Sequence, residues 1–174
     1  PSDYNILIVE DSKSLNHLTT STFEKKGYNC FSTASLKEAK FILDQKIIDY
    51  IILDINLPDG NGKEIINQCE KRTEKIFVLT CENSAELQKI SYQKGVMDFI
   101  IKDENLFYKI DQIIESIEQL EKNRNDTILI VDDSRSIQMQ LKDLLENRKY
   151  NVILASNIKD ALTIIQNDNI DLIL

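Results

Sequence analysis

Side chains that can bind a metal ion or an anion follow four apolar runs of this chain. Asp54 follows the run YIIL, Glu10 and Asp11 follow NILIV, and Thr80 and Lys102 end two later runs in the same way. Three carboxylates brought together repel one another unless a cation neutralises them, and oxygen ligands without histidine or cysteine favour Mg²⁺. A phosphoryl group on Asp54 would then receive hydrogen bonds from Lys102 and from the Thr80 hydroxyl.

These side chains can meet only if the apolar runs are parallel strands whose carboxyl ends share one sheet edge. The chain alternates strand-length apolar runs with segments of helical periodicity, which predicts an α/β fold: a doubly wound parallel sheet of five strands. The expected strands are 5–9, 28–32, 50–53, 76–79 and 97–101. The expected helices are 12–26, with Ser12 as N-cap, then 35–45, 62–72, 84–94 and one from 106 to about 120.

Composition excludes several classes of function. A net charge of −8 leaves no basic patch for nucleic acid, and the apolar runs are too short to span a membrane. With no signal peptide, we expect a cytoplasmic protein. Cys30, Cys69 and Cys81 are odd in number and lack metal-ligand spacing, which indicates reduced thiols. His17 is the only histidine, so histidine-based catalysis is not expected.

The sequence repeats itself after 122 residues. TILIVDDSRS lies on NILIVEDSKS, and 16 of the 47 pairs from Ile6 to Ile52 are identical at that offset, which indicates a second copy of the domain. Glu10 and Asp11 thereby gain the counterparts Asp132 and Asp133, a second acidic pair.

The second copy is a partial one. The expected organisation is a complete domain over 1–122, a linker over 123–125 and the first half of a second domain over 126–174. The counterpart of Asp54 would fall two residues past Leu174. Because such a half leaves an apolar strand edge uncovered, we expect it to pair with the same half of a second chain in a homodimer.

Residues 4–122 resemble a receiver domain of a two-component response regulator, and 126–174 resemble the first half of another. The resemblance implies a flavodoxin-like sheet with strand order 2-1-3-4-5. It rests on the acidic pair Glu10 and Asp11, the acceptor Asp54 followed by Pro58 and Gly62, Thr80, and Lys102 preceded by Phe99.

The resemblance implies that Asp54 accepts a phosphoryl group from a phosphohistidine on a sensor histidine kinase or a phosphotransfer protein. Mg²⁺ would be held by Glu10, Asp11, Asp54 and the backbone carbonyl of Asn56. The chain would thus accept a phosphoryl group and lose it again by self-dephosphorylation, without being an enzyme acting on another substrate.

The resemblance also implies a switch formed by Thr80 and Phe99. In the family, the hydroxyl moves toward the phosphoryl group and the aromatic ring turns inward, which reshapes the face made by the fourth helix, the fifth strand and the fifth helix. That face is a second possible homodimer surface. Asn56 and Glu82 lie where the family tunes water attack on the aspartyl phosphate, and their small or acidic side chains predict a short-lived phosphoryl state.

Three residues depart from the family pattern. Glu10 replaces the commoner aspartate and lengthens a metal-facing side chain by one methylene. Asp103 stands where a proline usually follows the lysine through a cis bond, so either the loop holds a strained peptide or Lys102 reaches the site by another path; Asp103 could instead cap the fifth helix. Cys81 occupies a position where a smaller residue is common.

Other functions remain open from the sequence. A phosphatase of the haloacid dehalogenase type needs a second aspartate two residues after the first, and Asn56 stands there instead. A second alternative is a receiver-like interaction module that works without phosphorylation. A third is the input part of a larger effector such as a diguanylate cyclase.

Overall fold

The computed structural model describes residues 4–70 and 72–174. The chain forms two compact units, Pro1–Ile113 and Ile114–Leu174. Residues 1–3, at the start of the predicted first domain, and residue 71, inside the predicted helix 62–72, lie outside the described residues.

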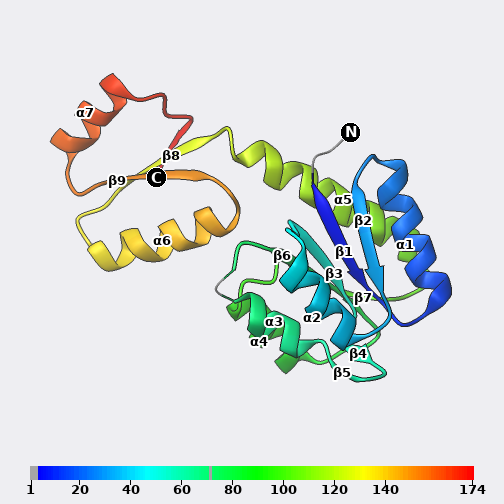
Figure 1. The fold of residues 1–174 in the computed structure, drawn as a ribbon. Coiled ribbons are helices and arrows are strands. Elements are labelled where there is room, and N and C mark those ends of the chain that lie inside the picture. The colour runs from blue at the N-terminus through cyan, green and yellow to red at the C-terminus, as the bar shows by residue number, and fades with distance from the viewer. Residues whose placement is uncertain (1–3, 71) are drawn as a thin grey trace. The chain divides into compact units, whose positions relative to one another are not determined.

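The first unit is built on a parallel sheet of five strands in the order β2-β1-β3-β6-β7 (Figure 1). Because β4 and β5 form a separate small hairpin, this is the predicted order 2-1-3-4-5, and the predicted α/β fold is confirmed. The central strands β1, β3 and β6 are largely apolar and buried, as expected of strands with both faces covered. Their bounds are β1 Asn5–Val9, β2 Asn29–Thr33, β3 Tyr50–Leu53, β6 Lys75–Thr80 and β7 Asp98–Ile101.

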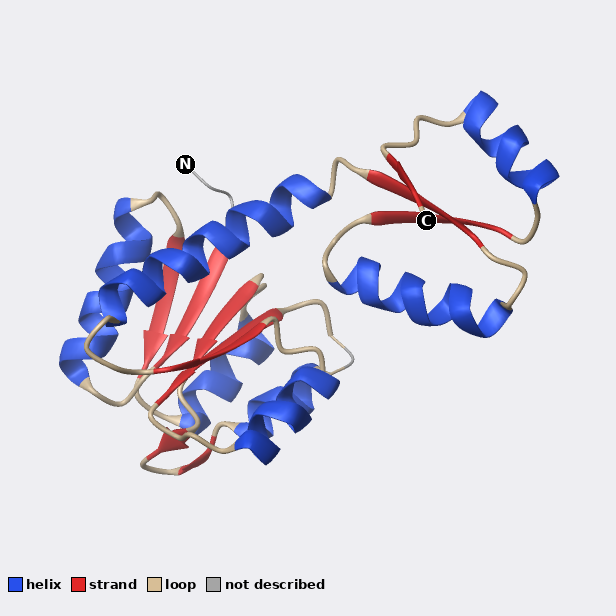
Figure 2. Cartoon of the chain, turned by 180° about the vertical axis from the view of Figure 1, so that it is seen from behind, coloured by secondary structure: helices blue, strands red, loops and turns tan. Residues whose placement is uncertain are grey.

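Helices cover both faces of this sheet (Figures 1 and 2). One apolar cluster joins buried strand residues to side chains from α2, α3 and α4, so these three helices share one face. Within the described part of the chain, no helix is both long and apolar enough to cross a membrane. The bounds are α1 Lys13–Lys25, α2 Leu36–Gln45, α3 Lys63–Cys69, α4 Ala85–Gln93 and α5 Leu106–Asn123.

Local signals set most helix ends. Ser35 and Ser84 accept hydrogen bonds from the amides three residues later, at 3.3 and 3.2 Å, and so cap α2 and α4. Gly27, with φ 90°, follows α1 in the left-handed region that glycine adopts without strain. Ser12 occupies the predicted N-cap position of α1, but its side chain makes no capping hydrogen bond.

Two helix ends differ from the sequence prediction. The helix expected over 62–72 ends at Cys69, and the Arg72 guanidinium contacts the Leu43 carbonyl at 3.0 Å and the Glu74 carboxylate at 2.7 Å. The helix α5, expected to end near residue 120, continues to Asn123, into the range predicted as linker. The Asn123 side chain is buried and donates to the Arg148 carbonyl at 2.9 Å.

The loop after β3 contains a hairpin that the sequence analysis did not predict. β4, Asn56–Leu57, pairs antiparallel with β5, Gly60–Asn61. A side chain on Gly62 would place its Cβ 2.5 Å from the Asp54 carbonyl oxygen, so only glycine lets α3 begin so close to this residue.

The second unit repeats the first part of this fold. Its three parallel strands have the order β10-β8-β9. A small cluster around Leu129, Ala155 and Ala161 forms its core. The bounds are β8 Thr127–Val131, α6 Arg135–Asn147, β9 Asn151–Ala155, α7 Ile158–Asn167 and β10 Leu172–Ile173.

Candidate functional site

Four of the predicted site residues lie together at one edge of the first unit's sheet: Glu10, Asp11, Asp54 and Lys102. The parallel registers align Val9 with Leu53, Leu53 with Val78 and Thr80 with Ile101, so the strands end at nearly the same level. Glu10, Asp54 and Lys102 each follow a strand directly. The sheet therefore delivers the acidic and basic side chains to the same place.

Lys102 contacts two carboxylates at this edge of the sheet. Its Nζ lies 2.5 Å from Glu10 Oε2 and 2.5 Å from Asp54 Oδ2. The three side chains are only 7, 7 and 8% exposed. Buried charges are tolerated when they are paired and hydrogen-bonded, and here one ammonium group contacts both carboxylates and offsets one of their two negative charges.

Burial and charge act in opposite directions on these groups. Burial raises the pKa of Glu10 above its usual range, although the hydrogen bond and charge of Lys102 oppose the shift. Burial works to lower the pKa of Lys102, but the hydrogen bonds and charges of Asp54 and Glu10 outweigh it and raise that pKa. Lys102 therefore stays positively charged at neutral pH and holds the two carboxylates together.

Carboxylate oxygens of Glu10, Asp11 and Asp54 lie within 4.8 Å of one another. Two oxygen ligands of one octahedral Mg²⁺ are separated by about 3 to 4 Å, which is close to this limit. All three donors are hard oxygen atoms, as Mg²⁺ prefers. The donor set thus fits the predicted cation. The Asn56 amide donates to Asp54 Oδ1 at 3.3 Å, and its side chain is exposed.

Thr80 and Phe99 are both buried. The Thr80 side chain is at the end of β6, and its hydroxyl oxygen accepts a hydrogen bond from the Glu82 amide at 3.2 Å. Phe99 packs in the cluster shared with α2, α3 and α4, so its ring points inward in this structure. Its amide also contacts the Tyr92 hydroxyl of α4 at 3.2 Å.

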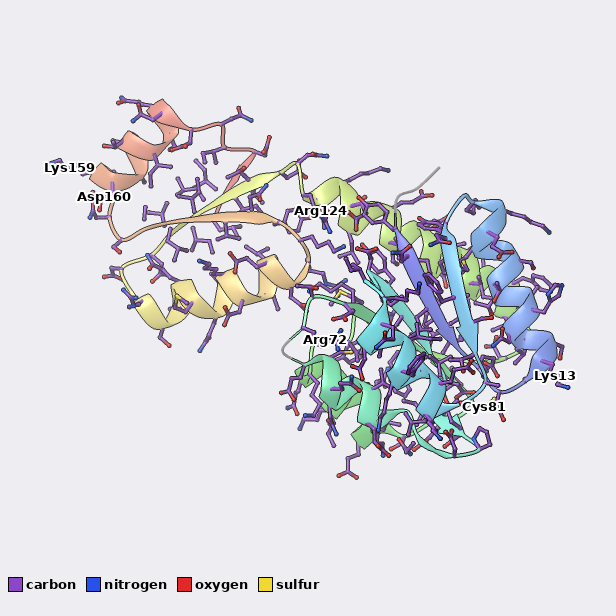
Figure 3. All side chains as sticks on the ribbon, viewed as in Figure 1. Lys13, Arg72, Cys81, Arg124, Lys159 and Asp160 are labelled. Carbon is purple, nitrogen blue, oxygen red and sulfur yellow. The ribbon has the colours of Figure 1, made fainter. Side chains whose placement is uncertain are left out.

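Two of the three departures from the family pattern are explained by the contacts around them. Asp103 accepts from the Asn105 amide at 2.9 Å and pairs with Lys109 at 2.5 Å; the Lys109 hydrogen bond and that amide hold the pKa of Asp103 below its usual range. No peptide bond among the described residues is cis, so Lys102 reaches both carboxylates through a trans bond. Cys81 is exposed (Figure 3), so its thiol does not fill the buried site.

Asp59 and Asn16 make contacts near the site that no sequence motif predicted. Asp59 lies in the β4–β5 turn, and its two carboxylate oxygens accept from the amides of Leu36 and Lys37 at 2.7 and 2.9 Å, which ties the loop after β3 to the start of α2. Asn16 shares a helical stripe with the buried residues Thr19 and Phe23. A polar residue on that stripe was the available signal that Asn16 has a specific partner.

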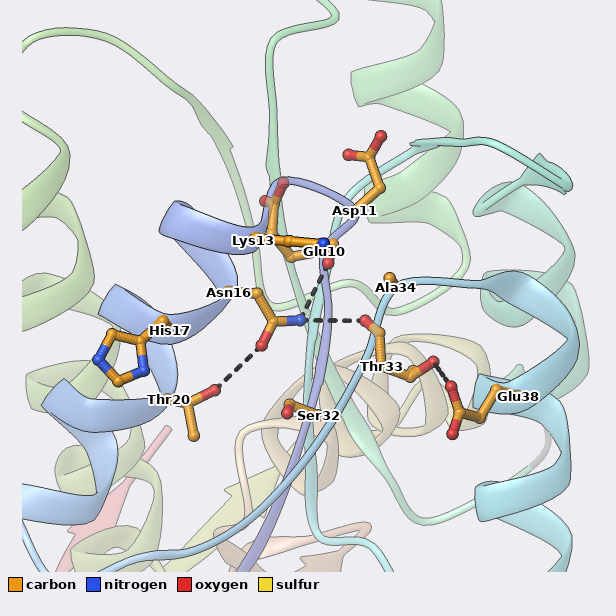
Figure 4. A pocket seen from close by; sticks show the side chains of 10 residues that line it. All are labelled: Glu10, Asp11, Lys13, Asn16, His17, Thr20, Ser32, Thr33, Ala34 and Glu38. Carbon is orange, nitrogen blue, oxygen red and sulfur yellow. Dashed lines mark hydrogen bonds between the residues drawn. The ribbon is translucent and has the colours of Figure 1, made fainter.

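A polar cavity of about 360 Å³ opens beside the acidic pair (Figure 4). It lies between the ends of β1 and β2 and the first turns of α1. His17, the single histidine, is one of its lining residues and is exposed. The side chains lining it are Glu10, Asp11, Lys13, Asn16, His17, Thr20, Ser32, Thr33, Ala34 and Glu38.

The second unit keeps the local arrangement of the acidic pair. Asp132 Oδ1 accepts from the Ser134 amide at 2.7 Å, just as Glu10 Oε1 accepts from the Ser12 amide at 3.1 Å. Asp132 is half-buried and Asp133 is exposed. Among the described residues, this unit has no carboxylate at the end of its third strand.

The sequence of this chain is similar to those of known proteins. The model of the response regulator receiver domain matches residues 6–118 and again 128–174. The TorCAD operon transcriptional regulatory protein TorR of Escherichia coli is 29% identical over 119 residues, which cover 62% of this chain and 52% of TorR. The aerobic respiration control protein ArcA of Escherichia coli is 31% identical over 102 residues, covering 58 and 43%. This chain therefore spans about half the length of these relatives.

Solved structures agree with this assignment of the fold. A CheY-like receiver domain protein from Methanospirillum hungatei superposes with a TM-score of 0.63 at 28% identity, covering 70% of this chain and 98% of that one. A two-component system response regulator/GGDEF domain protein superposes with a TM-score of 0.78 at 24% identity, covering 98 and 69%. At that identity the second comparison supports the fold alone.

Proposed function

Because this chain belongs to the response regulator receiver domain family, we propose that its first copy accepts a phosphoryl group on Asp54 from a histidine kinase or a phosphotransfer protein. The observation that supports this most is the position of Lys102, whose ammonium group contacts both Glu10 and Asp54 at the carboxyl edge of the sheet. A lysine placed there can move from the carboxylates to a phosphoryl group without leaving the site.

In the proposed reaction, an Asp54 carboxylate oxygen attacks the phosphorus of the donor phosphohistidine. The new O–P bond forms as the N–P bond breaks, and the imidazole leaves with the electron pair of that bond. Lys102 then donates a charge-assisted hydrogen bond to the phosphoryl oxygens, and the Thr80 hydroxyl, after releasing the Glu82 amide, donates a second. Glu10, Asp11, Asp54 and the Asn56 carbonyl would hold Mg²⁺, which when bound neutralises charge on the phosphoryl oxygens.

The output face is part of the same proposal. Movement of Thr80 toward a phosphoryl group would change the packing next to Phe99, and Phe99 is linked through its amide to Tyr92 of α4.

Asn56 is exposed and Glu82 is half-buried, so water can approach the acceptor and the phosphoryl state should be short-lived. The cytoplasmic location, the homodimer and a role as input to a larger effector stay predictions.

The decisive test is incubation of the 174-residue chain with phosphoramidate and Mg²⁺, followed by intact-mass measurement. We expect one phosphoryl group per chain, and none for Asp54→Asn. Asp132→Asn, in the acidic pair of the second copy, is the matched control and should be labelled like the unmutated chain. Labelling that persists in Asp54→Asn would refute the assignment, and an unmutated chain that stays unlabelled would favour the phosphorylation-independent module.

A further inference from the structure

The side-chain amide of Asn16 joins the ends of two strands beside the acidic pair. Its Nδ2 donates to the Glu10 carbonyl at 2.9 Å and to the Thr33 carbonyl at 3.2 Å (Figure 4). The amide orientation follows from chemistry, because both carbonyl oxygens can only accept hydrogen bonds. The Thr20 hydroxyl, one turn further along α1, donates to Asn16 Oδ1 at 3.4 Å. Asn16 is thus held at both ends of its amide.

These two hydrogen bonds lie where the chain leaves the sheet. β1 ends at Val9, and the Glu10 amide still makes a strand-like hydrogen bond to the Thr33 carbonyl at 3.0 Å. The Glu10 carbonyl is the next backbone group, and Asn16 of α1 binds it from outside the sheet. Asn16 therefore fixes the backbone from which the Glu10 and Asp11 carboxylates extend.

The second copy makes the same contacts with a different amide. Gln138 lies 122 residues after Asn16, and its Nε2 donates to the Asp132 carbonyl at 2.7 Å and the Ala155 carbonyl at 2.9 Å. Asp132 and Ala155 are the counterparts of Glu10 and Thr33 at the same offset. The residue type differs between the copies, but the two donated hydrogen bonds are the same.

We propose that Asn16 is a positioning residue for the metal site, and that it acts through the Glu10 backbone rather than by touching the ion. The inference rests on the proposed function, which assigns Mg²⁺ to Glu10, Asp11 and Asp54. Mg²⁺ demands a nearly ideal octahedral geometry, so a small rotation of the Glu10–Asp11 backbone weakens binding. Loss of an outer-shell partner typically lowers metal affinity by about 10- to 100-fold.

The test compares variants of the full 174-residue chain by isothermal titration with MgCl₂ and by thermal unfolding without metal. Asn16→Leu keeps the size of the side chain but removes the donor, and should weaken Mg²⁺ binding about tenfold. Asn16→Gln keeps the donor, as Gln138 does, and should recover most of that affinity. His17→Leu, at the exposed neighbouring position, is the matched control and should bind Mg²⁺ like the unmutated chain.

Each outcome has a distinct meaning. If Asn16→Leu unfolds more easily but binds Mg²⁺ with unchanged affinity, Asn16 is only structural and the inference is wrong. It is also wrong if Asn16→Gln binds as weakly as Asn16→Leu. If Asn16→Leu does not fold, Asn16→Ser, which is too short to reach both carbonyls, serves in its place with the same expectation. If the unmutated chain binds no Mg²⁺, the proposed function fails first and the inference fails with it.

Discussion

The two copies in this chain have the same helices and strands, but equivalent side chains are buried to different extents. The helices α6 and α7 have the same lengths as α1 and α2 and begin 122 residues later. The strand β9 likewise has the length of β2 and begins 122 residues after it. The strand register is also repeated, since Ile6 aligns with Cys30 and Ile128 with Val152. Nearly identical elements therefore form from sequences that agree at 16 of 47 positions.

Burial separates the two copies. Leu36 is 5% exposed but its counterpart Ile158 is 74% exposed, and Tyr50 is 0% exposed but its counterpart Leu172 is 51% exposed. In the first copy β6 pairs with β3, and the β4–β5 turn packs on Leu36. The described residues of the second copy include no such elements. Local sequence thus specifies helices and strands, and in the first copy the elements that follow β3 help to bury side chains such as Leu36 and Tyr50.

The largest expected effect tests this difference in burial. Leu43 is 1% exposed and its counterpart Ile165 is 42% exposed. Leu43→Ala should lower the free energy of unfolding of the first copy by about 2 to 5 kcal/mol, because it removes methyl groups and leaves a cavity. Ile165→Ala should cost the second copy less than about 1 kcal/mol, since a partly exposed side chain loses little burial.

Native-state hydrogen exchange of β1 and β8 amides measures the two copies separately. Lys37→Ala and Lys159→Ala, at exposed equivalent positions, are the controls and should change neither copy appreciably. An equally large loss in Ile165→Ala would contradict the comparison. It would show that Ile165 is covered in solution.

The sequence predicted those features that depend on short segments. Strand-length segments bounded by charges or glycine marked the five strands, and the residues that end four of them marked the site, because strand ends in a parallel sheet share one edge. It could not predict contacts that depend on how α1 and the hairpin pack. Asp59 lies 23 residues from Leu36, and Asn16 lies 17 residues from Thr33. No local periodicity encodes these distances.

A smaller effect tests the hairpin that only the first copy has. Two backbone amides, from Lys37 and Leu36, hold the pKa of Asp59 below its usual range. A carboxyl group with a lowered pKa in the folded state stabilises the fold above its unfolded pKa, and this contribution is lost as the pH falls through the folded value. The start of α2 should therefore loosen in acid below about pH 4.

Amide chemical shifts measured by NMR between pH 6 and pH 2 test this directly. The Leu36 and Lys37 amides should titrate together with a midpoint below the ordinary aspartate value, and Asp59→Asn should remove the transition. The equivalent Ile158 and Lys159 amides should not follow that titration, because the described residues of the second copy include no counterpart of the hairpin that carries Asp59. An Asp59→Asn chain whose Leu36 amide still titrates would rule out this explanation.

The smallest expected effect concerns the turn after the first helix of each copy. Gly27 has φ 90° and its counterpart Lys149 has φ 67°, so the second copy places a lysine in the left-handed region. Such a conformation costs a residue with a side chain about 1 to 2 kcal/mol. The Lys149 ammonium group offsets part of this cost by pairing with Glu121 at 2.5 Å, where both side chains are nearly buried.

Two alanine substitutions and one glycine substitution separate the backbone cost from the ion pair. Lys149→Ala loses the pair and keeps the left-handed backbone, whereas Lys149→Gly loses the pair and relieves the backbone, so the glycine variant should be more stable by about 1 kcal/mol. Gly27→Ala should destabilise the first copy by a similar amount, about 1 kcal/mol. Hydrogen exchange of β8 and β1 amides measures both. Equal stabilities of Lys149→Ala and Lys149→Gly would show that the turn carries no backbone strain, and that the two copies tolerate this position for different reasons.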